Sequence, residues 1–217
     1  MQQTELFVPG AYWTPDRAAE AVRRMVAHLA SPEMQALMAS IADEGPQGSI
    51  RQAFAPPPTD ANVAPIDPAR CVVRRGRAAD IPRFAELMLR ADLPPLFIEE
   101  FVEGFAAIEH EGTVIACGGL EIYGDCGVIR SIVVDEAARG TGLGRRIAEV
   151  LMEDARLAGA SDVYLFTVDA WPFWKHLGFV DLPIAEWREP PRASWQYSVI
   201  ERYGEVFEAI HSMWRRV

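Results

Sequence analysis

The stretch IVVDEAARGTGLGR, residues 132–145, combines a run of β-branched residues with three glycines spaced two apart. Isoleucine and valine favour a strand that ends at Val134, and apolar residues recur at helical spacing from 143 onward, which predicts a helix over 142–157. The first N–H groups of a helix lack partners within it, and the helix dipole is positive at that end. Glycines at this point let an anion approach the backbone. The stretch therefore predicts a strand, an anion-binding loop and a helix.

Two familiar phosphate-binding loops do not fit this stretch. A P-loop requires Gly-Lys-Ser or Gly-Lys-Thr, and the chain contains neither tripeptide. A dinucleotide fingerprint that starts at Gly140 would place its third glycine at position 145, which is Arg145. Taken alone, the loop leaves open the alternative of a glycine-rich turn that merely begins a helix.

Composition excludes several classes of protein. The formal net charge of −10 argues against nucleic acid as a partner, because phosphate binding requires a basic surface. We find no run of about 18 apolar residues and no signal peptide, so we expect a cytoplasmic protein that does not enter a membrane. The 3 cysteines lack metal-ligand spacing, which predicts reduced thiols and no metal site.

The chain is expected to divide into four parts. Residues 1–44 predict a small helical extension, with Thr14 capping a helix from Pro15 to about Ala30 and a second helix from about Pro32 to Asp43. Residues 45–70 are rich in proline and read as a linker. Residues 71–198 form the main domain, and residues 199–217 predict an amphipathic C-terminal helix with Val206, Phe207, Ile210 and Trp214 on one side.

Within the main domain, hydrophobic periodicity alternates between that of strands and that of helices, which predicts an α/β (α+β) fold. The expected order is β-α-α-β-β-β-α-β-α, followed by strand-like and irregular sequence. The expected segments begin near residues 71, 80, 95, 105, 113, 126, 142, 162 and 170.

Three motifs resemble those of the GNAT superfamily of N-acetyltransferases. Arg139-Gly140-Thr141-Gly142-Leu143-Gly144 after Ile132-Val133-Val134 is similar to its motif A. Val73-Arg74 followed by Asp80 resembles the first strand and helix cap, and Trp174-Lys175-His176-Leu177-Gly178-Phe179 resembles a late signature of the family. The resemblance spans about residues 71–185. It implies a mixed, mostly antiparallel central sheet flanked by helices.

The resemblance also implies a coenzyme site. Acetyl-CoA would enter between the fourth and fifth strands, with the backbone of Ile132, Val133 and Val134 beside its pantetheine arm. The loop would hold the pyrophosphate, and the N–H of Val134 would stabilise the oxyanion that develops on the thioester. The loop residues implied are Arg139, Gly140, Thr141, Gly142, Leu143, Gly144 and Arg145.

A narrower resemblance concerns the acceptor. Gly118-Gly119-Leu120-Glu121-Ile122-Tyr123-Gly124, followed by Ile129-Arg130-Ser131, is similar to the subset of the family that acts on amino acids, including acetylglutamate-synthase-like and arsenic-resistance-type enzymes. It implies Glu121 and Tyr123 as catalytic residues and Arg130 and Ser131 as substrate-binding residues. Arg130 could hold a carboxylate and Glu121 could attract an ammonium group, but the two could equally form a cross-strand ion pair.

Trp174 departs from the family, which often has tyrosine there as the acid for the leaving thiolate. An indole N–H cannot serve as that acid at neutral pH, so Tyr123, Tyr164, water or no acid at all remain open. The expected activity is acetyl transfer to the amino group of a small molecule, an amino acid or analogue. A catalytically silent acyl-CoA-binding module and a protein or peptide N-acetyltransferase remain alternatives. A homodimer is possible by analogy with the family.

Overall fold

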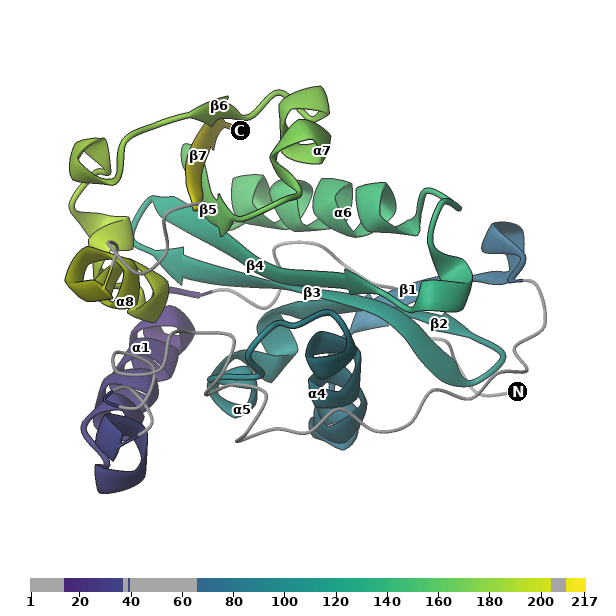
Figure 1. Cartoon of the computed structure of the whole chain (residues 1–217), viewed down its shortest axis with the longest axis horizontal. Helices are drawn as coiled ribbons and strands as arrows, with labels where there is room; N and C mark the ends of the chain where they lie inside the picture. The colour runs from purple at the N-terminus through teal and green to yellow at the C-terminus, as the bar shows by residue number, and fades with distance from the viewer. Residues whose placement is uncertain (1–13, 37–38, 40–65, 204–209) are drawn as a thin grey trace.

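A computed structural model of the chain describes residues 14–36, 39, 66–203 and 210–217. One seven-stranded sheet with the order β1-β2-β3-β4-β5-β7-β6 forms its centre (Figure 1). The strands are β1 (Val72–Arg75), β2 (Phe105–His110), β3 (Thr113–Tyr123), β4 (Cys126–Val134), β5 (Asp162–Thr167), β6 (Val180–Asp181) and β7 (His211–Arg216). Strands β4 and β5 pair in parallel and the other neighbours pair antiparallel, which confirms the expected mixed, mostly antiparallel sheet.

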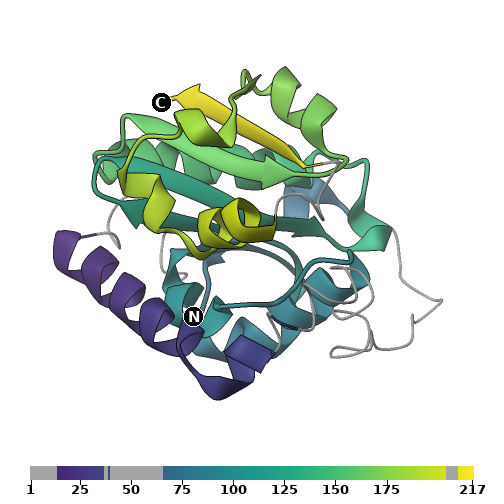
Figure 2. The same ribbon diagram turned by 60° about the vertical axis from the view of Figure 1, so that its left-hand side comes forward.

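Helices cover both faces of this sheet. Figure 1 shows α6 along one face and α4 and α5 on the other, with α1 and α8 near each other at one end. Figure 2 shows α1 running beside α5 beneath α8. The helices are α1 (Pro15–Leu29), α4 (Ile81–Arg90), α5 (Ile98–Phe101), α6 (Leu143–Leu157), α7 (Trp171–His176) and α8 (Trp195–Tyr203).

The tight approach of α6 to the sheet explains one of the paired glycines of β3. A Cβ atom at Gly118 would lie 2.6 Å from a side-chain carbon of Ile147 on α6 and 2.7 Å from one of Ile132. Any larger residue would push the helix away from β3 and β4, whose apolar side chains form the core with it. The position of α6, and therefore of the loop before it, depends on this contact.

The predicted C-terminal helix over 199–217 is wrong. Helix α8 ends at Tyr203, and residues 211–216 form strand β7 between β5 and β6. Each residue of β5 from Asp162 to Thr167 pairs with a residue of β7, so pairing with a distant strand overrides the local helical spacing. Val206 and Phe207, on which the prediction partly rested, lie outside the described residues.

Other expected elements keep their type but change their length. The helix expected to begin near residue 95 is the short α5 followed by a 3₁₀ turn over Val102–Gly104. The first helix of the N-terminal extension is confirmed as α1, and residues 32–36 of the second are helical. The end of that second helix and most of the predicted linker lie outside the described residues.

Candidate functional site

Strands β4 and β5 part from each other after the first third of β4. Their parallel ladder joins Cys126–Val128 to Asp162–Tyr164 and stops there. Beyond it β4 continues to Val134 beside β3, and β5 continues to Thr167 beside β7. Between these described residues, the edges of the two strands that face each other have no ladder, which is the arrangement that an extended ligand arm requires if it is to pair as an added strand.

The backbone of Val134 faces this unpaired region. The next N–H group, that of Asp135, donates to the carbonyl of Ile115, the residue before Ala116 on β3. N–H groups alternate in direction along a strand, so the N–H of Val134 points away from β3, on the side of β5. The carbonyl of Val134 accepts a hydrogen bond from Nε of Arg139 at 3.3 Å instead of one from β3. The role implied for Val134 requires this orientation.

The loop that follows depends on backbone conformations suited to glycine. Gly140 has φ +78° and Gly142 has φ +83°, in the left-handed region, and Gly142 is the N-cap of α6. A Cβ atom at either position would meet nothing within 4 Å, so backbone conformation, not space, selects glycine here. The loop thus presents the N-terminus of a 15-residue helix without a side chain in front of it.

The side chains of the loop differ in whether they can contact a ligand. Leu143 is buried, so only its backbone can reach a ligand. The hydroxyl of Thr141 donates to the carbonyl of Ala138 at 2.5 Å, which fixes the loop. Arg145 is exposed and pairs with Glu149 one helical turn later, at 2.8 Å, so its guanidinium group is free to turn toward an anion at small cost.

A second cluster of polar side chains lies on β3 and β4. Nη1 of Arg130 lies 2.8 Å from one carboxylate oxygen of Glu121, and the hydroxyl of Tyr123 donates to the other at 2.6 Å. All three residues are buried, and Glu121 is 0% exposed. The cross-strand ion pair considered from the sequence therefore forms, and Tyr123 joins it.

Strand register brings this cluster together. Glu121 is opposite Val128 and Gly119 is opposite Arg130, so alternation places Glu121, Tyr123 and Arg130 on one face of the sheet. Gly119 leaves room for the arginine, because a Cβ atom there would lie 2.7 Å from the Phe105 ring and 3.2 Å from Cγ of Arg130.

The backbone is strained on both sides of Arg130. Ser131 has φ +53° at the irregularity where the β3–β4 register shifts, and its hydroxyl lies 3.3 Å from Nε of Arg130. Phe97 has φ +56°, and the carbonyl of the preceding Leu96 accepts a hydrogen bond from Nη2 of Arg130. Positive φ is unfavourable for bulky residues such as Phe97, and such strain is common at functional sites. Every guanidinium nitrogen of Arg130 consequently has a protein partner.

Residues from two helices cover the cluster. The sulfur of Met25 on α1 lies 3.8 Å from the Tyr123 hydroxyl. The Trp195 ring at the start of α8 lies over the Arg130 guanidinium with 5.3 Å between the Arg130 Cζ atom and the ring centre, and the Phe105 ring does so at 5.6 Å. Met25 is 0% and Trp195 8% exposed. The sequence carried no signal for either residue beyond an apolar helix position.

Burial and charge govern protonation in the cluster. Burial, followed by the neighbouring carboxylate of Glu121, raises the pKa of Tyr123 well above its usual value. The hydroxyl therefore remains protonated at neutral pH and is held as a donor to Glu121. Burial likewise raises the pKa of the nearby Cys117 thiol to about 12, which removes it as a nucleophile.

The other acid candidates are structural. Trp174 packs edge-on against Phe173 and Phe179 with ring centres 5.1 and 5.0 Å apart, and it is 5% exposed. Tyr164 is buried against Trp187, and burial raises its pKa to about 12.

Among the described residues, no group of three or more His, Cys, Asp or Glu side chains could hold a metal ion. In that same part of the chain, no helix is long and apolar enough to span a membrane.

Comparison with known proteins identifies the family. The model of the acetyltransferase (GNAT) family matches residues 77–179, which include the unpaired strand ends and the glycine loop. An amino-acid acetyltransferase of Mycobacterium tuberculosis is 34% identical over 125 residues, which cover 52% of this chain and 70% of that protein. The chain belongs to the GNAT family.

Further relatives carry related names. An amino-acid acetyltransferase of Neisseria meningitidis is 24% identical over 116 residues, which cover 49% of this chain but 27% of that longer protein. Among solved structures, the N-acetylglutamate synthase of Neisseria gonorrhoeae complexed with coenzyme A and N-acetyl-glutamate has a TM-score of 0.58 at 22% identity. This match covers 67% of the present chain and 35% of that protein, and at this identity it shows the GNAT fold alone.

A protein of Mycobacterium tuberculosis solved in complex with CoA is similar over nearly its full length. Its TM-score is 0.56 at 26% identity, and the match covers 67% of this chain and 99% of that one. The GNAT core is thus shared. Met25 of α1 and Trp195 of α8 lie outside the family-matched residues 77–179.

Proposed function

We propose that this GNAT protein is an acetyl-CoA-dependent N-acetyltransferase that acetylates the amino group of a small molecule, an amino acid or analogue. One observation carries the proposal. The part of β4 that is not paired with β5 leads directly into the glycine loop and the N-terminus of α6, all within residues 129–145. An extended arm ending in a pyrophosphate fits this order of groups: strand edge first, backbone N–H donors second.

The donor side then acts through the backbone. Acetyl-CoA supplies the acetyl group as a thioester. The outward N–H of Val134 would donate to the thioester carbonyl as negative charge develops on its oxygen, and such donors commonly contribute about 10²–10³ in rate. Arg139 and Arg145 add positive charge beside the phosphates. A thiol of pKa about 8.5 is a tolerable leaving group, so a dedicated acid is unnecessary.

The acceptor side is the cluster of Glu121, Tyr123, Arg130 and Ser131. Its carboxylate would attract the ammonium group of the acceptor and take its proton directly or through water, so that the free amine forms the new C–N bond as the C–S bond breaks. Tyr123 positions Glu121 by its 2.6 Å hydrogen bond. Arg130 contributes a buried positive charge that favours acceptors bearing a carboxylate. The names of the amino-acid acetyltransferase relatives support this class of acceptor.

A screen for coenzyme A release tests the proposal. Purified protein is mixed with acetyl-CoA and with separate panels of amino acids, polyamines and short peptides, and free thiol is measured. We expect release with one or more amino acids and a rise in melting temperature with acetyl-CoA alone. A thermal shift without turnover on any panel would indicate a silent acyl-CoA-binding module, and turnover with peptides alone would indicate a protein acetyltransferase. Either result would contradict the proposal.

A further inference from the structure

Arg130 already uses three of its five N–H donors within the protein. Its Nη1 donates to Glu121, its Nη2 to the carbonyl of Leu96 and its Nε lies 3.3 Å from the hydroxyl oxygen of Ser131. Breaking the contact with Glu121 would leave two buried charges unpaired, which is costly. A carboxylate bound in this cluster should therefore leave that contact intact, and a further donor beside Arg130 would strengthen its binding.

Trp195 provides such a donor. Its Nε1 atom is buried and has no hydrogen-bond partner among the described residues, and the residue is 8% exposed. Buried N–H groups are nearly always paired, because an unpaired one forfeits its bond with water. Two other tryptophans illustrate this, since Nε1 of the buried Trp187 donates to Ser212 at 2.6 Å and Nε1 of the half-buried Trp214 donates to Asp162 at 2.9 Å.

The position of Trp195 links this donor to the acceptor cluster. Its ring centre lies 5.3 Å from Cζ of Arg130 and 5.4 Å from the ring centre of Phe97. A carboxylate oxygen that accepted from Nε1 would thus be bound by the indole that covers this buried cation, whose positive charge attracts it. The acceptor's amino group would remain on the side of Glu121.

We propose that Trp195 is a specificity-determining residue that donates its indole N–H to the carboxylate of the acceptor. The proposal rests on the proposed function, because it presumes that the acceptor binds beside Glu121 and Arg130. It assigns selectivity for amino acids over simple amines to a residue of α8, outside the family-matched range 77–179.

The substitution Trp195→Phe separates the N–H group from the ring. Phenylalanine retains an aromatic surface over Arg130 but cannot donate. We expect the KM for the amino acid found in the release screen to rise about tenfold or more with kcat little changed, as for loss of one hydrogen bond to a charged group. The KM for the amine that lacks only the carboxylate should stay the same. Trp187→Phe is the matched control and should change the KM values for the two substrates by the same factor.

A second measurement does not depend on turnover. The rise in melting temperature that the amino acid produces in the presence of coenzyme A should be smaller in Trp195→Phe than in the wild type and unchanged in Trp187→Phe. Equal KM changes for both substrates, or equal thermal shifts in Trp195→Phe and the wild type, would overturn the proposal and leave water as the partner of the indole. If the wild type acetylates no amino acid, the proposed function fails. The thermal shifts then decide the role of Trp195 separately, since no shift with any amino acid also overturns it.

Discussion

At the scale of single residues, the acceptor cluster is defined by the ion pair between Glu121 and Arg130. The paired side chains are 0% and 1% exposed, so neither charge is screened by water. Removing one partner leaves the other charge buried and alone, whereas removing both leaves no unpaired charge. The pair therefore constrains stability and chemistry together.

We predict that Glu121→Gln lowers the free energy of unfolding by about 3–5 kcal/mol and abolishes measurable acetylation. The double variant Glu121→Leu with Arg130→Met should recover most of the stability, because no unpaired charge remains, but none of the activity. Urea unfolding and coenzyme A release measure the two effects. Recovery of activity in the double variant would exclude both residues from the reaction.

Alanine substitutions at two glycines of similar conformation distinguish the effect of backbone strain from an effect on coenzyme binding. Gly142 before α6 has φ +83°, and Gly159 after α6 has φ +89°, and a Cβ atom would meet nothing within 4 Å at either. Alanine at each position should cost about 1–2 kcal/mol of stability from the left-handed backbone. Gly142→Ala alone should also raise the KM for acetyl-CoA. An equal KM in both variants would contradict coenzyme binding at the loop.

Several of these residues were identified from the sequence. Alternation along a strand sufficed to place Glu121, Gly119 and Tyr123 on one face, and the β-branched run before the glycines sufficed to place the loop. The contacts of Arg130 with Leu96 and Trp195 were not predictable, because they join segments 34 and 65 residues away through the fold. No local pattern encodes such pairs.

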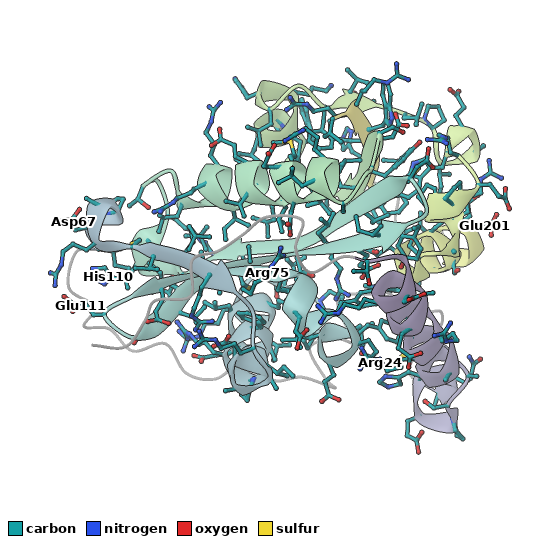
Figure 3. The ribbon with its side chains drawn as sticks, turned by 180° about the vertical axis from the view of Figure 1, so that it is seen from behind. Arg24, Asp67, Arg75, His110, Glu111 and Glu201 are labelled. Atoms are coloured by element: carbon teal, nitrogen blue, oxygen red, sulfur yellow. The ribbon has the colours of Figure 1, made fainter. Side chains whose placement is uncertain are left out.

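At the scale of elements, α1 is attached to the rest of the fold by a small set of contacts. Arg24 donates to the carbonyl of Glu100 at 2.9 Å, and the ring of His28 lies 2.7 Å from the carboxylate of Glu100. Figure 3 shows Arg24 on the side of α1 that is next to α5. The ring of His28 meets that of Phe97 edge-on at 5.3 Å. These contacts hold Met25 over Tyr123.

We predict that Arg24→Ala loosens α1, with amide exchange over residues 15–29 about three- to tenfold faster, as for loss of one hydrogen bond. Arg23→Ala is the matched control, because Arg23 pairs with Glu20 on the same exposed helix turn. Hydrogen exchange read by mass spectrometry distinguishes the two. If both variants exchange alike, the bond to Glu100 does not hold the helix.

Strand β7 is the element whose type the local sequence pattern predicted wrongly. Its alternation is short, with Met213 buried between partly exposed neighbours, and the apolar residues before it suggested a helix. The sheet offers the free edge of β5, and a strand with six register partners there satisfies more backbone groups than an isolated helical turn. Tertiary pairing decided the outcome, whereas α1 and α6, with strong periodicity and clear start signals, were predicted nearly to the residue.

At the scale of the whole molecule, buried or half-buried carboxylates bind arginines throughout the fold. Asp80 is 9% exposed, and burial tends to raise its pKa. The hydrogen bonds from Arg74 and from the backbone N–H of Arg77, together with the charges of both arginines, outweigh burial and lower the pKa below the usual value. Asp162 behaves in the same way, with burial opposed by Ser161, Trp214 and Arg188. Such groups make the fold sensitive to acid.

Stability should consequently fall as the pH drops below about 4. A carboxyl group with a lowered folded-state pKa binds fewer protons in the folded than in the unfolded protein, so its contribution is complete above its usual pKa and is lost as the pH falls through the folded value. The Asp80→Asn variant should be less stable than the wild type at pH 7. It should also lose less stability than the wild type between pH 7 and pH 3. Glu153→Gln, which alters an exposed pair with Arg156, should resemble the wild type. Thermal unfolding at the two pH values provides the comparison.

The covering of the acceptor cluster by Met25 and Trp195 has a consequence for how this protein relates to others of its family. The segment that would receive the coenzyme is continuous and lies inside the family-matched residues 77–179, as do Glu121 and Arg130, whereas Met25 and Trp195 come from helices outside that range. On the proposed function, acceptor recognition thus draws partly on segments outside the family-matched residues. Exchange of α1 and α8 between relatives offers a route to altered substrate range that leaves the acetyl-donor machinery untouched, and a shared family name does not by itself transfer an acceptor.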